Sequence, residues 1–355
     1  MSWTVTEEPA LRGFTVEWLA VDAMILSRRE QLYRRKGDEP PTPLGRVPVT
    51  WWRACLSRIR PAQRLLRAMV YNVAPLPDGS QFVTYGRQVG VLRDGRYVAL
   101  AGLVRPCRVL RGGAAVDDVG HVYFGEYLVN NDRGPMRVYR YTAGTKCVEI
   151  VHEFTAGAIR HVHGVTRDPF DRSLWCLTGD VGDECRLLRT KDGFRTLEVV
   201  GGGDETWRCV SLLFTASHVV YATDAEFTPN RVYRIERATG RREAVGELDG
   251  PTYYTIACGE DLFFAVTAEL CPSQVGRSAT LWWLNPAGQL ERLAAFEKDR
   301  LPVAIFLPGT LHLPRGPGRA DEFYFHAVGL RAADNRTFRV QRQASAAQSA
   351  IPLRS

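Results

Sequence analysis

The sequence predicts an all-β protein, a β-propeller in which four-stranded blades surround a central channel, and two observations carry this prediction. First, four short hydrophobic runs each end in a carboxylate, and an aromatic and basic run follows each one. The four carboxylates are Glu126, Asp180, Asp224 and Glu269. Second, their spacing is about 45 to 50 residues, the length of one four-stranded blade. Because equivalent positions in successive blades face one axis, these four carboxylates are expected to meet around one cavity.

The blades follow one another along the chain as groups of short strands separated by turn residues. We count seven blades, with six as the alternative if the first one is incomplete. Each blade runs from an inner strand that lines the channel to an outer strand at the periphery. The expected blades cover residues 14–35, 68–103, 106–154, 159–200, 207–248, 253–296 and 302–342.

The two ends of the chain are expected to close the ring. The last blade lacks an outer strand of its own, and the segment SWTVTEE at residues 2–8 can supply it. This closure removes exposed sheet edges, which are a liability of open β-structures. We therefore expect a single propeller domain over residues 1–345 and a frayed tail at 346–355.

The composition is that of a soluble globular protein. The chain has 355 residues, of which 45% are hydrophobic and 24% charged. It contains no run of eighteen apolar residues, and its first residues lack the pattern of a secretory signal. Eight cysteines without CxxC spacing favour reduced thiols. These features predict a cytoplasmic protein, and we expect it to be a monomer.

The positive charge is local. The formal net charge is +7, and most of it lies in residues 1–70. Residues 49–68 form a basic insertion, in which 51–67 mixes arginines with Trp51 and Trp52. The favoured interpretation is a connection packed on the propeller rim, because Pro61 interrupts any continuous amphipathic helix. Contact with an anionic membrane surface is the less favoured alternative. Nucleic-acid binding is not expected, since no reader motif is present.

One hairpin carries a family resemblance. The segment RTKDGFRTLEVV at 189–200 resembles an Asp-box, the Ser/Thr-x-Asp-x-Gly-x-Thr-Trp hairpin of BNR-repeat proteins. The matching residues are Thr190, Asp192, Gly193 and Thr196, whereas Leu197 replaces the aromatic residue. Over residues 70–330 the chain resembles the BNR/sialidase-like propeller superfamily. That resemblance implies a glycosyl hydrolase-like protein connected with polysaccharides, and it implies a structural role for the Asp-box.

Two histidines form the strongest local signal for chemistry. In Arg160-His161-Val162-His163-Gly164, the two imidazoles are two residues apart on an inner strand, so they are expected to share a face near the carboxylates. His161 and His163 with Asp180 could ligate a divalent cation such as Ca²⁺ or Mn²⁺. They could instead divide acid and base roles. In either case we expect the catalytic residues among the two histidines and the four carboxylates.

Alignment of the inner strands adds candidate ligand-binding residues. Matching Gly164 with Ser211 and Ala257 places His161 in register with Arg208 and Tyr254, and a slip of one residue substitutes Tyr253. In the last blade His326 occupies the position of the carboxylates. An arginine, a phenol and an imidazole suit an anionic or hydroxyl-rich ligand.

The leading hypothesis is therefore a propeller that binds a saccharide or uronic acid in a central polar pocket. Paired carboxylates fit glycoside hydrolysis, whereas a His/Tyr pair with a neutralising arginine fits β-elimination as in polysaccharide lyases. The alternative hypothesis is a non-catalytic scaffold that docks a protein or an anionic surface through its basic N-terminal region. The sequence leaves these alternatives open.

Overall fold

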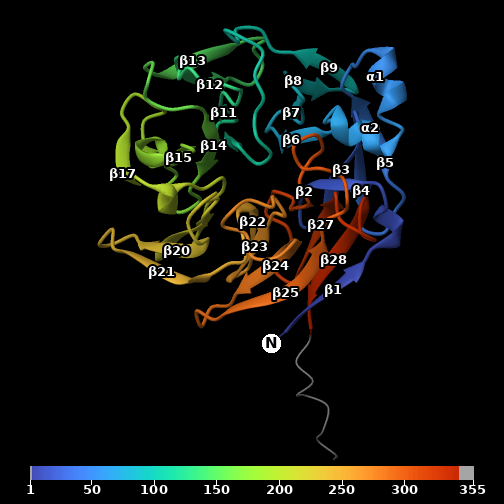
Figure 1. Cartoon of the computed structure of the whole chain (residues 1–355). Coiled ribbons are helices and arrows are strands. Elements are labelled where there is room, and N and C mark those ends of the chain that lie inside the picture. The colour runs from blue at the N-terminus through green and yellow to red at the C-terminus, as the bar shows by residue number, and fades with distance from the viewer. Residues whose placement is uncertain (1, 344–355) are drawn as a thin grey trace, which may run out of the picture.

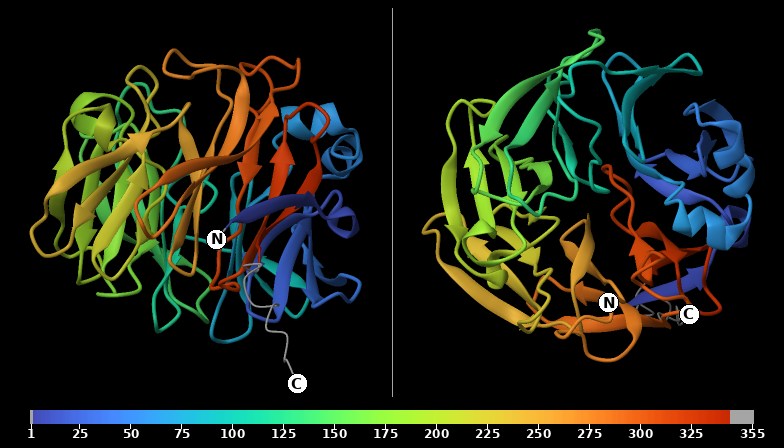
Figure 2. Two further views of the ribbon diagram at one scale, coloured as in Figure 1. Left: turned by 90° about the horizontal axis from the view of Figure 1, so that it is seen from below. Right: turned by 45° about the horizontal axis from the view of Figure 1, so that its top comes forward.

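The computed structural model describes residues 2–343 and confirms a seven-bladed β-propeller (Figure 1). Seven antiparallel sheets of four strands each are arranged in a ring, and Figure 2 shows this ring from two further directions. The tail expected to fray at 346–355 lies outside the described residues.

The strands of the first four blades follow the order of the chain. Blade 1 contains β2 (Thr15–Leu19), β3 (Ala23–Arg28), β4 (Gln31–Lys36) and β5 (Thr42–Arg46). Blade 2 contains β6 (Val70–Pro75), β7 (Gln81–Tyr85), β8 (Gln88–Arg93) and β9 (Arg96–Ala99). Blade 3 contains β10 (Ala114–Val116), β11 (Val122–Gly125), β12 (Met136–Tyr141) and β13 (Val148–Phe154). Blade 4 contains β14 (Val162–Arg167), β15 (Leu174–Thr178), β16 (Arg186–Thr190) and β17 (Glu198–Gly202).

The remaining blades complete the ring. Blade 5 contains β18 (Leu213–Phe214), β19 (His218–Ala222), β20 (Arg231–Glu236) and β21 (Arg242–Glu247). Blade 6 contains β22 (Thr252–Cys258), β23 (Asp261–Val266), β24 (Ser278–Leu284) and β25 (Leu290–Glu297). Blade 7 contains β26 (Thr310–His312), β27 (Glu322–Val328), β28 (Arg336–Arg342) and β1 (Trp3–Glu7).

The second strand of each blade forms much of the core. Every residue of β7, β15 and β23 is buried, because these strands are covered on both faces by neighbouring blades. Their hydrophobic runs therefore lack polar alternation, as expected for strands buried on both faces. Phe82 of blade 2 packs against Phe124 of blade 3 with ring centroids 5.4 Å apart. Each fully buried side chain of this size contributes about 1.5–3 kcal/mol.

The first and last segments of the chain lie side by side in blade 7. Strand β1 pairs antiparallel with β28, from Trp3 opposite Arg342 to Glu7 opposite Phe338. The Trp3 ring packs edge-on against Phe263 of blade 6 at 4.9 Å between centroids. The blue first strand beside the red last strands is visible in Figure 1.

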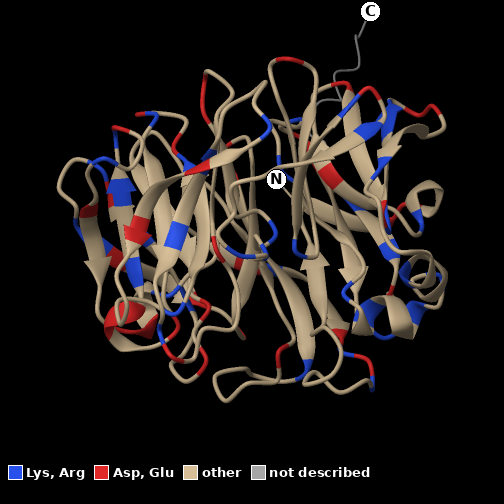
Figure 3. Ribbon diagram, turned by 90° about the horizontal axis from the view of Figure 1, so that it is seen from above, with Lys and Arg blue, Asp and Glu red and all other residues tan. Residues whose placement is uncertain are grey.

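The basic insertion between blades 1 and 2 forms two short helices, α1 (Trp51–Leu56) and α2 (Arg60–Leu65). Pro61 lies in the first turn of α2, where its missing N–H is tolerated. The helices contain arginines but no acidic residue, so they are blue and tan in Figure 3. Arg60 donates to Asp334, and Arg64 is buried against Asp299. These two arginines therefore hold the insertion against the C-terminal part of the chain.

Within 2–343, no helix has the length and apolar character needed to cross a bilayer.

The hairpin between β16 and β17 is tied by side-chain hydrogen bonds. The Asp192 carboxylate accepts hydrogen bonds from the Thr190 hydroxyl at 2.8 Å and from the Thr196 backbone N–H at 3.0 Å. Gly193 has a φ of 69°, a conformation that favours glycine. This turn joins the two outer strands of blade 4, away from the channel.

Candidate functional site

The central channel contains a cavity of about 620 Å³. Its walls come from inner strands and from the loops that follow the second strands. A segment that links β25 to β26 also contributes the apolar residues Val303, Phe306, Leu307 and Pro308. The volume is in the range of small-molecule binding sites.

β-Bulges direct three side chains into this cavity. The pairing between first and second strands skips one residue in four blades. In blade 1 this residue is Glu17, which does not line the cavity. In blades 2, 4 and 6 the three skipped residues are Tyr71, His163 and Tyr253. A bulged residue is left out of the ladder, and bulges commonly re-aim side chains beside functional sites. All three residues line the cavity. Tyr253 is thus the structural counterpart of His163, and Tyr254 lines the cavity beside it.

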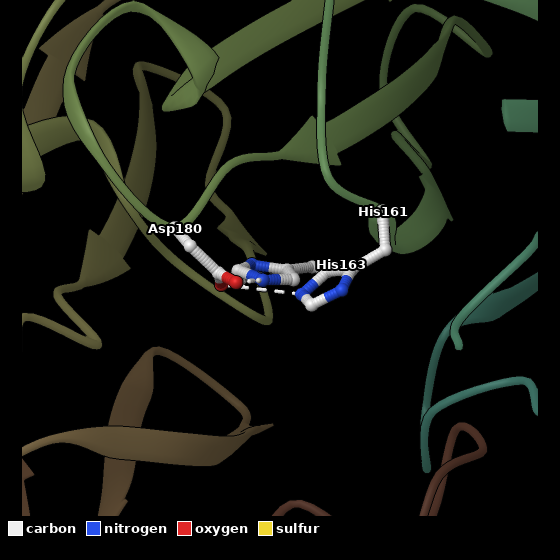
Figure 4. Close-up of side chains that lie close together, drawn as sticks. All are labelled: His161, His163 and Asp180. Carbon is white, nitrogen blue, oxygen red and sulfur yellow. Dashed lines mark hydrogen bonds and ion pairs between the residues drawn. The ribbon is translucent and has the colours of Figure 1, made fainter. Parts of the chain in front are cut away.

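His161, His163 and Asp180 converge on one point of the cavity wall (Figure 4). The Nε2 atoms of both histidines lie 3.2 Å from Oδ1 of Asp180, and the imidazole centroids are 5.1 Å apart. His161 immediately precedes β14 and His163 is its bulged residue. Asp180 is the second residue after β15. All three residues are buried.

The tautomer of His163 makes this cluster a candidate cation site. Its Nδ1 atom lies 3.0 Å from the backbone carbonyl of Cys209, which can only accept a hydrogen bond, so Nδ1 carries a proton. In a neutral imidazole Nε2 then presents a lone pair toward the carboxylate of Asp180. Either a second proton or a cation is needed between these two acceptors. A ligating histidine whose other nitrogen donates to a carbonyl is the usual arrangement in metal sites.

The distance of each histidine nitrogen from Asp180 also fits a metal ion, and all three ligand atoms lie within 4.8 Å of one another. For ligand bonds of about 2.1 Å, neighbouring ligands lie about 3.0 Å apart at right angles and about 3.4 Å apart in a tetrahedron. The observed 3.2 Å separations are between these values. Two arginines compete with a cation for Asp180. Arg160 Nη1 lies 3.0 Å from Oδ2, and Arg208 Nη2 lies 3.7 Å from Oδ1.

Electrostatics around the histidines favour an ionised Asp180 and a neutral His161. Burial opposes ionisation of Asp180, but the hydrogen bonds with His161 and His163 outweigh it and hold the pKa of the carboxyl well below its usual value. Burial lowers the pKa of His161, despite the nearby Asp180. The His161 ring also packs against Tyr127 at 4.2 Å between centroids.

A second acidic group lies beside Arg208. The Nε atom of Arg208 lies 3.2 Å from Oδ2 of Asp224, whereas Oδ1 of Asp224 is buried without a hydrogen-bond partner among residues 2–343. Burial raises the pKa of Asp224. Burial, together with the Asp224 carboxylate, raises the pKa of Glu269 to about 7. Glu269 accepts a hydrogen bond from the Tyr253 hydroxyl. The charge of Asp224 therefore disfavours ionisation of Glu269 near neutral pH.

Two residues expected at the cavity lie elsewhere. Glu126 is completely buried inside blade 3, where Oε1 accepts a hydrogen bond from Tyr139 at 2.8 Å and Oε2 from Arg105 at 2.9 Å. The expected ring of four carboxylates is thus a set of three. His326 is not at a strand end but within β27, where Nδ1 contacts the Thr337 hydroxyl at 3.0 Å. Its buried ring does not line the cavity, and burial lowers its pKa to about 3.

Several cavity residues were missed in the sequence. Arg87 is the second residue after β7, the position that Asp180 and Asp224 have after β15 and β19. The signal was present in SQFVTYGR, where a hydrophobic run ends in a basic rather than an acidic residue. The other missed polar residues lie at a bulge, in loops, or in the inner strand β26. They are Arg67, Tyr71, Arg108, Arg111, Tyr127 and His312.

Comparisons with known proteins place the chain in a fold class. No family model matches it, and no curated protein matches it by sequence. The fold is similar to oligogalacturonate lyase from Vibrio parahaemolyticus, with a TM-score of 0.63, 11% identity, and coverage of 95% of this chain and 93% of that one. It is also similar to an oligogalacturonate lyase in complex with manganese, with a TM-score of 0.59, 12% identity, and coverage of 96% and 93%.

Other propellers are similar to a comparable degree. The WD40 repeats of RRP9 give a TM-score of 0.57 at 13% identity, covering 96% of this chain and 98% of that one. At such identities the likeness establishes the seven-bladed propeller and no activity. The resemblance to BNR-repeat proteins gains no support from any family model.

Proposed function

We propose that the protein binds an acidic saccharide in the central cavity and cleaves it by β-elimination next to a uronic-acid carboxylate. The observation that carries this proposal is the convergence of His161, His163 and Asp180, with a tautomer of His163 that leaves Nε2 facing a carboxylate oxygen. The fold-level likeness to oligogalacturonate lyases, one of them in complex with manganese, supports it.

The three converging residues would hold a divalent cation, and we propose Mn²⁺. A bound divalent cation neutralises a ligand carboxylate and so acidifies the neighbouring C–H bond. Arg208 lies next to this cluster and is available to orient the same carboxylate. Tyr253 and Tyr254 offer aromatic faces and hydroxyls to the sugar.

Asp224 and Glu269 would perform the proton transfers. Arg208 holds one oxygen of Asp224, and the Asp224 carboxylate accepts the proton as the C5–H bond breaks. Those electrons form the C4–C5 double bond while the C4–O bond breaks. Glu269, with its pKa raised to about 7, donates its proton to the departing oxygen.

Product analysis tests this proposal. Purified protein with Mn²⁺ is incubated with oligogalacturonate and with a neutral oligosaccharide, and ultraviolet absorbance and reducing ends are measured. We expect an unsaturated product from the acidic substrate alone, and a loss of at least about 100-fold in rate for Asp224→Asn. His152→Ala, in the outer strand β13, is a matched control. New reducing ends without unsaturation would instead identify hydrolysis, and no turnover or binding would overturn the proposal.

A further inference from the structure

The cavity contains arginines that the site described above does not use. Six arginines line it, together with only three carboxylates, those of Asp180, Asp224 and Glu269. Three of these arginines have anionic partners. Arg111 pairs with Glu17, Arg160 with Asp180, and Arg208 with Asp224. The other three, Arg67, Arg87 and Arg108, make no ion pair and no side-chain hydrogen bond within residues 2–343.

These three residues form a basic wall on the side of blade 2. Arg67 follows α2, Arg87 follows β7, and Arg108 lies in the connection from blade 2 to blade 3. Blade 2 is separated by blade 3 from blade 4, which supplies the His161–His163–Asp180 cluster, and lies across the channel from blade 5, which supplies Asp224 (Figure 1). One cavity therefore has two chemically different walls.

Two buried polar atoms in this basic wall also lack partners. The Nε atom of Arg108 and the hydroxyl of Tyr71 are both inaccessible to solvent and have no hydrogen-bond partner in the described part of the chain. Tyr71 is the bulged residue of β6, so its side chain is directed at the cavity. Unsatisfied buried polar groups are costly, and a bound anion is one way to satisfy them.

The three arginines also repel one another. Burial lowers the pKa of Arg108, and the positive charges of Arg67 and Arg87 lower it further. The cluster thus weakens the ligand-free fold unless an anion offsets its charge. Arginine is well suited to that role because its planar guanidinium can bind a carboxylate through two parallel hydrogen bonds.

We propose that Arg67, Arg87, Arg108 and Tyr71 form a second anion subsite, which binds another carboxylate of the same saccharide. This inference rests on the proposed function, because the first carboxylate is taken to lie at the His161–His163–Asp180 wall. The ligand class is then an oligosaccharide with an acidic group on more than one sugar unit. A single uronic acid has one carboxylate and can occupy only one of the two anion sites at a time.

Calorimetric titration with a uronic-acid trimer and with the monomer tests this subsite. We expect Arg87→Ala and Arg108→Ala each to weaken trimer binding about 10-fold or more, and to change monomer binding by no more than about twofold. Arg96→Ala, an exposed arginine on β9 of the same blade, is the matched control. Equal trimer affinity for Arg87→Ala, Arg108→Ala and Arg96→Ala would overturn the subsite.

A second measurement separates failure of the subsite from failure of the proposed function. Inorganic sulfate is added at constant ionic strength while the melting temperature is followed. We expect sulfate to stabilise the wild type and Arg96→Ala, but not the Arg87→Ala/Arg108→Ala variant. If the wild type binds no saccharide yet shows this sulfate pattern, the subsite stands and the proposed function fails. If all variants respond equally to sulfate, the subsite is overturned.

Discussion

The Nε2 atom of His163 lies 3.2 Å from Oδ1 of Asp180, in a buried position where two lone pairs would otherwise face each other. The other nitrogen of the ring is committed to the carbonyl of Cys209. His163→Ala and Asp180→Ala should therefore each weaken Mn²⁺ binding, by at least about 100-fold, because loss of a ligand costs more than the 10- to 100-fold typical of an outer partner. Calorimetric titration with Mn²⁺ measures this directly.

The control for the Mn²⁺ experiment is His326→Ala. His326 is as buried as His163 but lies outside the cavity. Unchanged Mn²⁺ affinity in folded His163→Ala would show that the cluster is not a metal site.

Glu126 provides a contrast among the four carboxylates. We expect Glu126→Ala to lower the free energy of unfolding by about 2 to 3 kcal/mol, because it leaves the Arg105 and Tyr139 donors without their acceptor. Mn²⁺ affinity should stay within about twofold of the wild type, since Glu126 does not line the cavity. Urea unfolding and metal titration of the same preparation check both statements. Loss of Mn²⁺ binding in the folded variant would contradict this assignment.

The raised pKa of Glu269 predicts a pH-dependent stability. Folded protein holds this proton up to about pH 7, whereas an unfolded glutamic acid releases it near 4.5. The stabilising contribution is therefore complete below about pH 4.5 and is lost as the pH rises through 7. Glu269→Gln should gain on the order of 1 to 3 kcal/mol relative to wild type at pH 8, and little at pH 4.5. Urea unfolding at both pH values tests this, and a difference independent of pH would refute it.

Arg64 links the helical insertion to the cavity wall. Its buried guanidinium pairs with Asp299, donates to the Leu307 carbonyl at 3.1 Å and lies over the Phe306 ring. Arg64→Ala should cost about 3–5 kcal/mol, the range for breaking a buried pair. Because Phe306 and Leu307 line the cavity, saccharide affinity should fall as well. Arg58→Ala is the matched control in the same insertion. A stability loss in Arg64→Ala equal to that control would contradict this role.

The spacing of the hydrophobic runs predicted the propeller, because each blade has a buried second strand and these strands recur at a nearly constant number of residues along the chain. It also predicted that His161, His163, Asp180, Asp224 and Glu269 lie at one cavity, because equivalent strand ends in successive blades face the same axis. The bulges at Tyr71, His163 and Tyr253 were not predictable, because a bulge depends on local backbone geometry that has no fixed sequence signal.

Partners distant in sequence account for the remaining differences. Glu126 lies inside blade 3, where it accepts hydrogen bonds from Arg105 and Tyr139. Its position at the end of a hydrophobic run does not predict either of these hydrogen bonds. Arg87 was not predicted because the repeated position is acidic in blades 3 to 6, whereas here it carries a basic residue. The strand-end position alone would have predicted Arg87, but not Arg67, Arg108 or Tyr71 of the same wall.

The pairing of β1 with β28 has a consequence for how the cavity responds to mechanical or mutational opening. Five residue pairs at this seam hold the two ends of the chain together and so close the ring. The two cavity walls lie in different blades, so their relative position depends on a closed ring. The affinity for a ligand that contacts both walls should therefore depend on whether β1 remains paired with β28. Binding in the central cavity would indicate the state of a strand pair at the periphery.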